Sequence, residues 1–386
     1  MTNNLPLIRR SILVFLICAI AACTQPANQA LPLRLLTHRD FHVPEEAITE
    51  FTRRTGIQVV IFREPDATAV VDLLIKTRTA PIADVVIGID SLERRRVTEE
   101  LLVEPYEPID SQFLEDSLRL RDNMLTPVSS LEACFNRSVS SYIEPKRKID
   151  ELPDSSKLWL PPPEGLDDLL DPGHATSAVI PSPLSSRMGL YFLLALERSH
   201  PENSELPWPE FVDQMVRWGV TIVPTWEQAW FSFYSADQDI ANKENHYWTW
   251  GSAGMKAVTV QFQPRLPENL DIAVVPSDCG RVVNYAGLVA GTQARRNAGR
   301  LLDAMVEPLF QYHIPDRFGS RPARTDIART DAWKAFGETV SAPLVDEWRI
   351  GPLWGVWQLT WRQVVESASS GIELEPPEVQ VTLPKS

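Results

Sequence analysis

Hydrophobic residues in the first quarter of the chain alternate between short continuous runs and helical spacing. Residues 33–37, 57–62 and 83–89 are apolar runs bounded by polar residues, which is typical of buried strands. Between them, residues 44–56 and 67–79 place apolar side chains three and four positions apart, which predicts amphipathic helices. Strand, helix, strand, helix, strand in this order predicts a parallel sheet covered on both faces.

The same alternation returns later in the chain. A strand is expected at residues 178–180 and a helix at 189–197. Further strands are expected at 270–275 and 282–291, and a helix at 295–306. The stretch before residue 178 is rich in proline, and its hydrophobic pattern does not define strands clearly. The chain is therefore expected to be α/β over most of its length.

The loops after the predicted strands are the first candidate site, because ligands of such sheets bind beyond the carboxyl ends of the strands. His38 and Arg39 follow the first strand, and Asp90 follows the third. Asp90 also precedes a helix, so its carboxylate either caps that helix or contacts a ligand, or does both.

Two further groups of residues could serve in ligand binding or in a structural role, as a helix cap or in core packing. Ser185 and Ser186, followed by Arg187, stand before a helix, where they form either an anion site or a helix cap. Trp226 and Trp230 are four residues apart, so they share a helix face that either packs in the core or stacks on a planar or cationic ligand.

The N-terminus has the pattern of an export signal. Arg9 and Arg10 precede the apolar run 11–22, which is too short to span a membrane as a mature helix. The run ends in Ile-Ala-Ala before Cys23, which resembles the lipobox of bacterial lipoproteins, in which the cysteine carries the acyl chains. The alternative is an ordinary signal peptide with a chance cysteine. Residues 1–22 are therefore expected to be a lipoprotein signal peptide, and 23–32 a flexible tether.

Composition narrows the functional classes. A chain of 386 residues is long enough for two domains, and its net charge of −14 argues against nucleic-acid binding. Beyond the signal, Cys134 and Cys279 remain, and whether they form a disulfide is left open. The histidines are scattered, so no metal site is expected. Because nucleophile-elbow, phosphate-loop and metalloprotease motifs are missing from the sequence, an enzyme is not expected, nor is a cofactor.

The order of the weak motifs carries a family resemblance. Residues 51–60, 83–90 and 298–306 resemble segments of the periplasmic solute-binding proteins of ABC transporters, in the branch that contains thiamine- and ferric-ion-binding proteins. The resemblance implies a two-lobed periplasmic-binding-protein-like fold, with each lobe a mostly parallel sheet flanked by helices and the lobes joined by hinge strands.

The resemblance also gives the expected domain boundaries. Residues 33–125 are expected to form the first part of lobe I, and 126–275 lobe II. Residues 276–386 are expected to return to lobe I, with C-terminal helices packing across the lobes.

The loop positions and the resemblance together give the predicted ligand-binding residues. These are His38, Arg39, Asp90, Ser185, Ser186, Trp226, Trp230, Trp250, Ser252, Tyr285, Arg317 and Arg321. His38 stands where the family usually has a tyrosine, and the paired tyrosines of ferric-binding members are not evident, so a ferric ion is not expected. Acidic and aromatic groups facing serines and arginines suit a small zwitterionic or phosphorylated ligand.

The functional expectation is an exported solute-binding lipoprotein, periplasmic or at the cell surface, anchored through Cys23. It would capture a small ligand in the interlobe cleft and deliver it to an ABC permease in the membrane. The alternatives are a lipid-anchored sensor or scaffold that keeps the fold without transport and, with less support, a hydrolytic enzyme.

Overall fold

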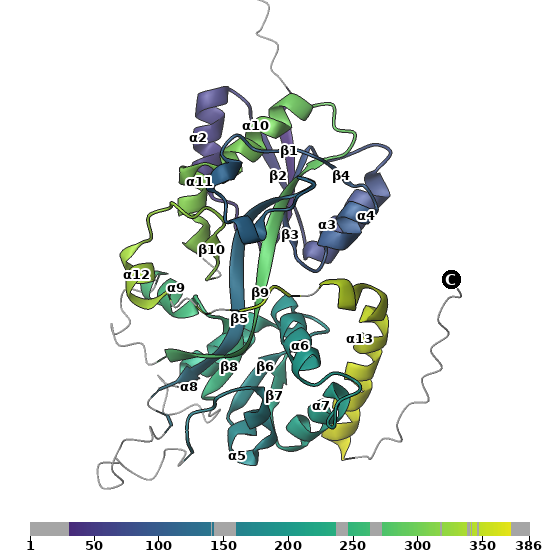
Figure 1. Cartoon of the computed structure of the whole chain (residues 1–386), viewed down its shortest axis with the longest axis vertical. Coiled ribbons are helices and arrows are strands. Elements are labelled where there is room, and N and C mark those ends of the chain that lie inside the picture. The colour runs from purple at the N-terminus through teal and green to yellow at the C-terminus, as the bar shows by residue number, and fades with distance from the viewer. Residues whose placement is uncertain are drawn as a thin grey trace, which may run out of the picture.

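The computed structural model describes residues 31–139, 141–142, 160–236, 246–262, 272–316, 319–337, 340, 342–345 and 347–371 (Figure 1). Along these ranges the strands are β1 (Leu33–His38), β2 (Val59–Glu64), β3 (Val85–Asp90), β4 (Val103–Glu104), β5 (Thr126–Ser138), β6 (Ala178–Pro181), β7 (Thr221–Val223), β8 (Trp248–Ser252), β9 (Ile272–Val289) and β10 (Arg321–Pro322). The helices are α2 (Glu45–Thr55), α3 (Ala67–Thr77), α4 (Arg94–Glu99), α5 (Pro172–Ala175), α6 (Arg187–Ser199), α7 (Trp208–Arg217), α8 (Trp226–Ala236), α9 (Met255–Phe262), α10 (Arg295–Val306), α11 (Pro308–Tyr312), α12 (Asp331–Phe336) and α13 (Glu347–Ser370). Short 3-10 turns are η2 (Ser111–Phe113), η3 (Asp116–Leu118), η5 (Leu166–Leu170) and η6 (Ile314–Asp316).

The two lobes are joined by long strands that run from one into the other (Figure 1). Lobe I, at the top of the figure, is built on β2, β1 and β3, which pair in parallel as predicted. Lobe II, below, is built on β8, β6 and β7, in which β6 pairs in parallel with both neighbours. The sheet order is β2-β1-β3-β9-β5-β8-β6-β7, so β9 and β5 stand between the lobe sheets. The predicted α/β two-lobed fold is therefore confirmed.

Strand β3 illustrates why the N-terminal runs form a covered sheet. All its residues are buried. Val85 and Ile87 pack into the core under α2 and α10, whereas Val86 and Ile89 pack into the core under α3 and α4. Successive side chains of a strand point to opposite faces, so a continuous apolar run requires apolar cover on both sides.

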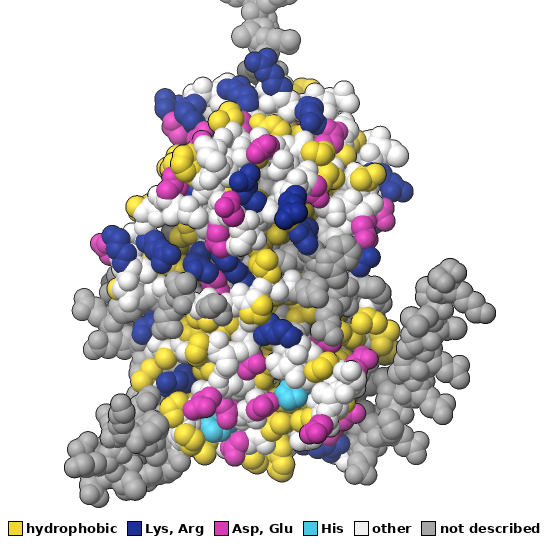
Figure 2. All heavy atoms as spheres, viewed as in Figure 1, with side chains coloured by type: hydrophobic (Ala, Val, Ile, Leu, Met, Phe, Trp, Pro, Cys, Tyr) yellow, Lys and Arg dark blue, Asp and Glu magenta, His cyan; other side chains and the backbone are white. Residues whose placement is uncertain are grey.

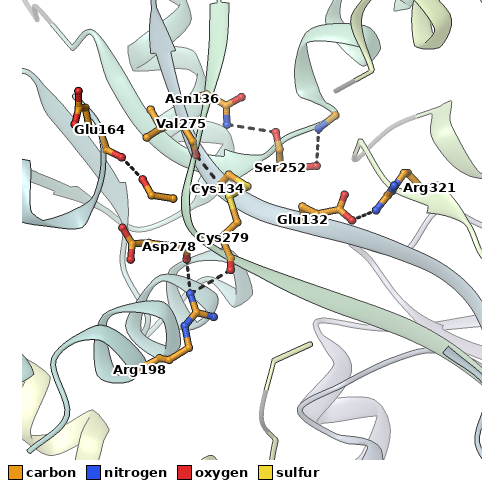
Figure 3. Close-up of a disulfide and its surroundings, with 12 residues drawn as sticks. Glu132, Cys134, Asn136, Glu164, Arg198, Ser252, Val275, Asp278, Cys279 and Arg321 are labelled. Carbon is orange, nitrogen blue, oxygen red and sulfur yellow. Dashed lines mark hydrogen bonds and ion pairs between the residues drawn. A yellow bond between two sulfur atoms is a disulfide. The ribbon is translucent and has the colours of Figure 1, made fainter. Parts of the chain in front are cut away.

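Strands β5 and β9 form the hinge. They pair antiparallel from Thr126 opposite Ala286 to Ser138 opposite Ile272. The separate strands expected at 270–275 and 282–291 are one 18-residue strand in the structure, interrupted by an irregularity opposite residues 133–135. At this bulge Cys279 forms a disulfide with Cys134, which answers the question left open by the sequence (Figure 3).

The core of lobe II is rich in aromatic side chains. Trp248 and Trp250 on β8 are 0% and 1% exposed, and both contact the ring of Phe135 on β5. The ring of Phe192, on α6, lies against Phe135 and Trp250. Trp248 and Trp250 therefore stabilise the core of lobe II by packing and do not form an exposed surface in this structure.

The C-terminal segment contacts both lobes. Helices α10 and α11 belong to lobe I, and α12 packs against α9 of lobe II. Helix α13 lies along lobe II, mainly against α7, and also contacts α4 of lobe I (Figure 1). Trp357 and Trp361 anchor it in the lobe II core, each 1% exposed. No described helix is both long and apolar enough to be a membrane span.

Candidate functional site

The polar loops at the ends of β3 and β6 meet between the lobes. Asp90 is the last residue of β3. Gly88, two positions earlier, has a φ of 88° and lies where the β3–β9 register shifts. A left-handed backbone at this position favours glycine. A Cβ on Gly88 would also come within 2.9 Å of the His38 ring and of the Phe41 Cβ. The glycine therefore lets the first-strand and third-strand loops pack closely.

Asp90 is buried and its carboxylate is fully engaged. Its Oδ1 accepts hydrogen bonds from the backbone N–H groups of Leu92 and Glu93, at 3.0 and 3.1 Å, so it caps the turn that leads into α4. The carboxylate also accepts hydrogen bonds from the Arg187 guanidinium, at 2.5 and 2.8 Å, and from the Tyr191 hydroxyl, at 2.8 Å. Burial alone would raise the pKa of Asp90, but the Arg187 guanidinium and these hydrogen bonds hold it below its ordinary value.

Arg187 and Tyr191 both come from the start of α6 in lobe II, so this cluster ties the lobes together. A third lobe I residue, Thr68, accepts from Arg187 Nη1 at 3.3 Å and donates to Glu93 at 2.6 Å. The Arg187 guanidinium also lies 3.6 Å from Glu93. We call Asp90, Glu93, Thr68, Arg187 and Tyr191 the interlobe latch. Its central arginine lies at the anion site suggested by the sequence, but here it neutralises an internal carboxylate.

The loop after β1 lies beside this latch. His38 is buried, and its Nε2 donates to the Gly88 carbonyl oxygen at 3.0 Å. Burial lowers the pKa of His38 to about 4; the charge of Asp90 opposes this shift and that of Arg187 adds to it. Arg39 and Asp40 are exposed. The pKa of Asp40 is raised by desolvation and by the charge of Glu227, which follows Trp226 in lobe II.

The predicted serines hold the loops of lobe II in place. The Ser185 hydroxyl donates to the carbonyl of Pro224 at 2.7 Å, which joins the loop after β6 to the loop after β7. Ser186 is the N-cap residue of α6, although its side chain makes no capping hydrogen bond. Trp226 begins α8 and is half-buried. These loops approach lobe I at the latch, and the charge of Glu227 also acts on Asp40.

Other predicted residues lie in the interior or elsewhere. Trp230 is 8% exposed in a lobe II cluster, and Trp250 belongs to the main core of that lobe. Tyr285 is buried in lobe I, where Arg94 interacts with its hydroxyl. Ser252 is buried and donates to the Gly319 carbonyl at 3.1 Å. A contact of these four residues with a ligand remains a prediction.

The predicted arginines are not brought to Ser185 and Ser186 in the part of the chain that the structure describes. Arg321, on β10, pairs with the buried Glu132 of the hinge strand β5 (Figure 3). Arg317 lies outside the described residues, as does Cys23. No group of three or more His, Cys, Asp or Glu side chains in the described ranges is placed to hold a metal ion.

Sequence reasoning missed several residues between the lobes. Tyr191 lies among the apolar residues of α6, so its position gives no sign of a polar contact. Glu227 is an acid in the first turn of α8, a common position for acids, and it stands between the two candidate tryptophans. Asp40 stood in a loop that was singled out, but it was not among the predicted contacts. The position of Arg187 directly after two serines was the available signal. Its partner could not be read from the sequence, because Asp90 lies 97 residues away in the other lobe.

Comparisons with known proteins show similarity at the level of structure. No family model matches the chain, and no curated protein matches its sequence. Among solved structures, a periplasmic thiamin-binding protein matches with a TM-score of 0.66 at 16% identity, over 86% of this chain and 96% of that one. The apo ferric ion-binding protein A of Pasteurella haemolytica gives 0.65 at 12% identity, over 86% and 97%. Iron-bound HitA of Pseudomonas aeruginosa gives 0.64 at 15%, over 86% and 99%.

These matches cover nearly the full length of each solved structure, so they extend over both lobes and the hinge. At this level of identity they show the fold and not the ligand. The chain therefore has the fold of the periplasmic thiamin- and ferric-ion-binding proteins.

Proposed function

We propose that the chain is an exported solute-binding protein that captures a small organic ligand between its lobes and delivers it to an ABC-type permease. The observation that carries the proposal is the meeting of strand-end loops from both lobes around the interlobe latch. Two lobes on hinge strands convert ligand binding into a change of shape, which a membrane partner can read. The fold shared with periplasmic binding proteins supports the same conclusion.

The charges beside the latch favour a ligand with a cationic or planar part. Asp90 is already neutralised by Arg187, so it offers no free carboxylate. Desolvation raises the pKa of Asp40, and the nearby charge of Glu227 raises it further, so a cation beside Asp40 would be stabilised. Trp226 precedes Glu227 at the start of α8 and is half-buried against the lobe II cluster, and its exposed part is the aromatic surface proposed for the same group. The ligand class proposed for this cleft is a small organic molecule with a positively charged group.

Native mass spectrometry of the full chain, purified without denaturation, tests the proposal. We expect a bound small molecule that is lost on unfolding, and calorimetry with that molecule then defines its site. Trp226→Ala should weaken binding by roughly 5- to 150-fold, which corresponds to about 1–3 kcal/mol for a lost aromatic contact. The matched control is Trp218→Ala, which removes a tryptophan that is 45% exposed at the end of α7. Equal affinity in both variants would place the ligand elsewhere.

The proposal includes anchoring through Cys23, because the apolar run and small residues before it fit a lipoprotein signal. Cell fractionation of Cys23→Ala should move the protein from the membrane to the soluble fraction or block its processing. Unchanged membrane association would refute the anchor. Deletion of the gene tests delivery to a permease. If the chain binds a ligand but cells without it take up that ligand normally, the chain is a sensor or scaffold instead.

A further inference from the structure

A cavity of about 250 Å³ lies beside the hinge strands, apart from the latch. Its described lining includes four arginines and a single acid: Arg281, Arg321, Arg324, Arg329 and Glu115. In the space-filling view, Lys and Arg side chains gather at the waist between the lobes, on the side of α12 (Figure 2). We call this cavity the arginine pocket.

The arginine pocket forms where the chain crosses from lobe I to lobe II. Arg281 is on the hinge strand β9, directly opposite Glu132 of β5. The segment from β10 to α12 covers the cavity, and Trp333 on α12 packs against Ala257 and Val258 of α9 in lobe II. A group bound in this cavity would therefore touch the hinge strand β9 and the segment from β10 to α12, which packs against lobe II.

Two of the arginines are held by internal acids. Arg281 donates to both oxygens of Glu115, at 2.7 and 2.6 Å, and this pairing lowers the pKa of Glu115 to about 2. Arg324 donates to Asp110 at 2.8 Å and to Asp326 at 2.6 Å, and its guanidinium lies 4.4 Å from the centre of the Phe113 ring. These pairs fix the walls of the arginine pocket.

The other two arginines carry unused hydrogen-bonding capacity. Arg321 pairs with Glu132, but its buried Nε finds no acceptor among the described residues. Arg329 is exposed and forms no ion pair with any residue that the structure describes. Burial lowers the pKa of Arg321, the charge of Glu115 opposes this shift, and that of Arg329 adds to it. The two guanidinium groups therefore repel each other.

A second donor without an acceptor belongs to the same lining. Trp333 is 2% exposed, and its indole N–H has no hydrogen-bond partner in the described part of the chain. A buried donor left unpaired costs about 1–3 kcal/mol, and more when it is charged. A bound anion would offset the repulsion between the two arginines and would place negative charge near both unpaired donors.

We propose that the arginine pocket binds a small oxyanion, either a carboxylate or a phosphate, held by Arg321 and Arg329. Planar guanidinium groups match both oxyanions with paired hydrogen bonds. The volume accommodates several water-sized groups, which suits a phosphate ion or a small dicarboxylate. The site does not depend on the proposed transport function, because no hydrogen bond or ion pair connects the lining to Asp90 or Ser185.

Calorimetry on the full chain with inorganic phosphate, sulfate and succinate tests the site. We expect saturable binding that weakens with added salt. Arg329→Gln and Arg321→Gln should each reduce the affinity about tenfold or more, as expected for the loss of a charge-assisted hydrogen bond. The matched control is Arg300→Gln, which makes the same charge change on the exposed face of α10. It should bind as the wild type does.

The outcomes separate the possible sources of the anion. Binding of succinate alone assigns the arginine pocket to organic acids, and binding of phosphate and sulfate assigns it to phosphate-like groups. Arg321→Gln removes the partner of the buried Glu132 and can disturb folding. Arg329→Gln changes an exposed side chain and is not expected to affect folding. No saturable binding of any of the three anions, or equal affinities in Arg329→Gln and Arg300→Gln, overturns the proposal. Retention of the cleft ligand by Arg329→Gln in native mass spectra would leave the proposed function intact in either case.

Discussion

At the scale of single residues, the most consequential feature is a charged cluster buried between two lobes. Arg187 and Asp90 compensate each other, and Tyr191 and two backbone N–H groups satisfy the remaining acceptor capacity. Removing one partner of such a pair leaves an unpaired buried charge, whereas the intact pair adds little net stability. The latch is thus better suited to selecting one arrangement of the lobes than to stabilising the fold.

His38 makes stability depend on pH because it is buried beside this cluster. It faces Asp90 at the end of β3, Arg187 of α6 and Asp66 at the start of α3, and its pKa is lowered from 6.5 to about 4, mainly by burial. Above pH 6.5 it is neutral in both the folded and the unfolded chain. Between pH 6.5 and 4 the unfolded chain binds a proton that the folded chain does not, so stability falls as the pH falls.

We expect the free energy of unfolding to decrease by an amount on the order of 3 kcal/mol across this window from His38 alone. Urea unfolding at several pH values measures it. His38→Gln should flatten the profile between pH 6.5 and 4, while the loss below pH 4.5 that comes with protonation of Glu115 should remain. A slope unchanged by His38→Gln would contradict this account.

At the scale of elements, the disulfide joins the two hinge strands where their pairing is irregular. Cys134 and Cys279 are 145 residues apart in sequence, so the bond closes a long loop in the unfolded chain. Arg198 on α6 donates to the carbonyls of Asp278 and Cys279 beside it, which ties the bulge to lobe II (Figure 3). The bulge is therefore held by both covalent and polar contacts.

Replacing both cysteines with serine should lower the free energy of unfolding by about 2–5 kcal/mol, mainly by freeing the unfolded chain. Chemical unfolding of the full chain, with and without a reductant, is the measurement. The reductant should destabilise the wild type by a similar amount and leave the double variant unchanged. An equal effect of the reductant on both proteins would show that the bond is not the cause.

How far the sequence predicts an element depends on where its partners lie. Strand β3 and helix α10 were predicted closely, because a continuous apolar run and an amphipathic spacing are local signals. Strand β9 was predicted as two strands, since Pro276 and Ser277 look like a strand end, and only pairing with β5 carries the backbone through them. Contacts such as Asp90 with Arg187 were not predictable, because they depend on how two lobes meet.

At the scale of the whole molecule, the two lobes are joined by the paired strands β5 and β9 and by contacts across their boundary, which include the latch and the packing of α13 against α4. Most of each core lies within its own lobe, but the hinge strands contribute to both cores, and Leu92 of lobe I packs against the lobe II core. The relative position of the lobes is then set by contacts of modest energy, of which the latch is one. Domain closure of this kind is absorbed by the backbone of a few hinge residues, and a ligand shifts it as far as its affinities for the two states differ.

The latch leads to a prediction about shape in the absence of ligand. Arg187→Ala removes the group that joins Asp90, Glu93 and Thr68 to lobe II, so the ligand-free lobes should separate and the radius of gyration should increase. Small-angle X-ray scattering measures this change, and adding the ligand found by native mass spectrometry should reverse it. Arg198→Ala, on the same helix, breaks contacts made to the hinge bulge rather than to lobe I, so it should keep the wild-type radius. Identical radii for Arg187→Ala and the wild type would show that other contacts hold the lobes. The latch would then serve only to bury and neutralise Asp90.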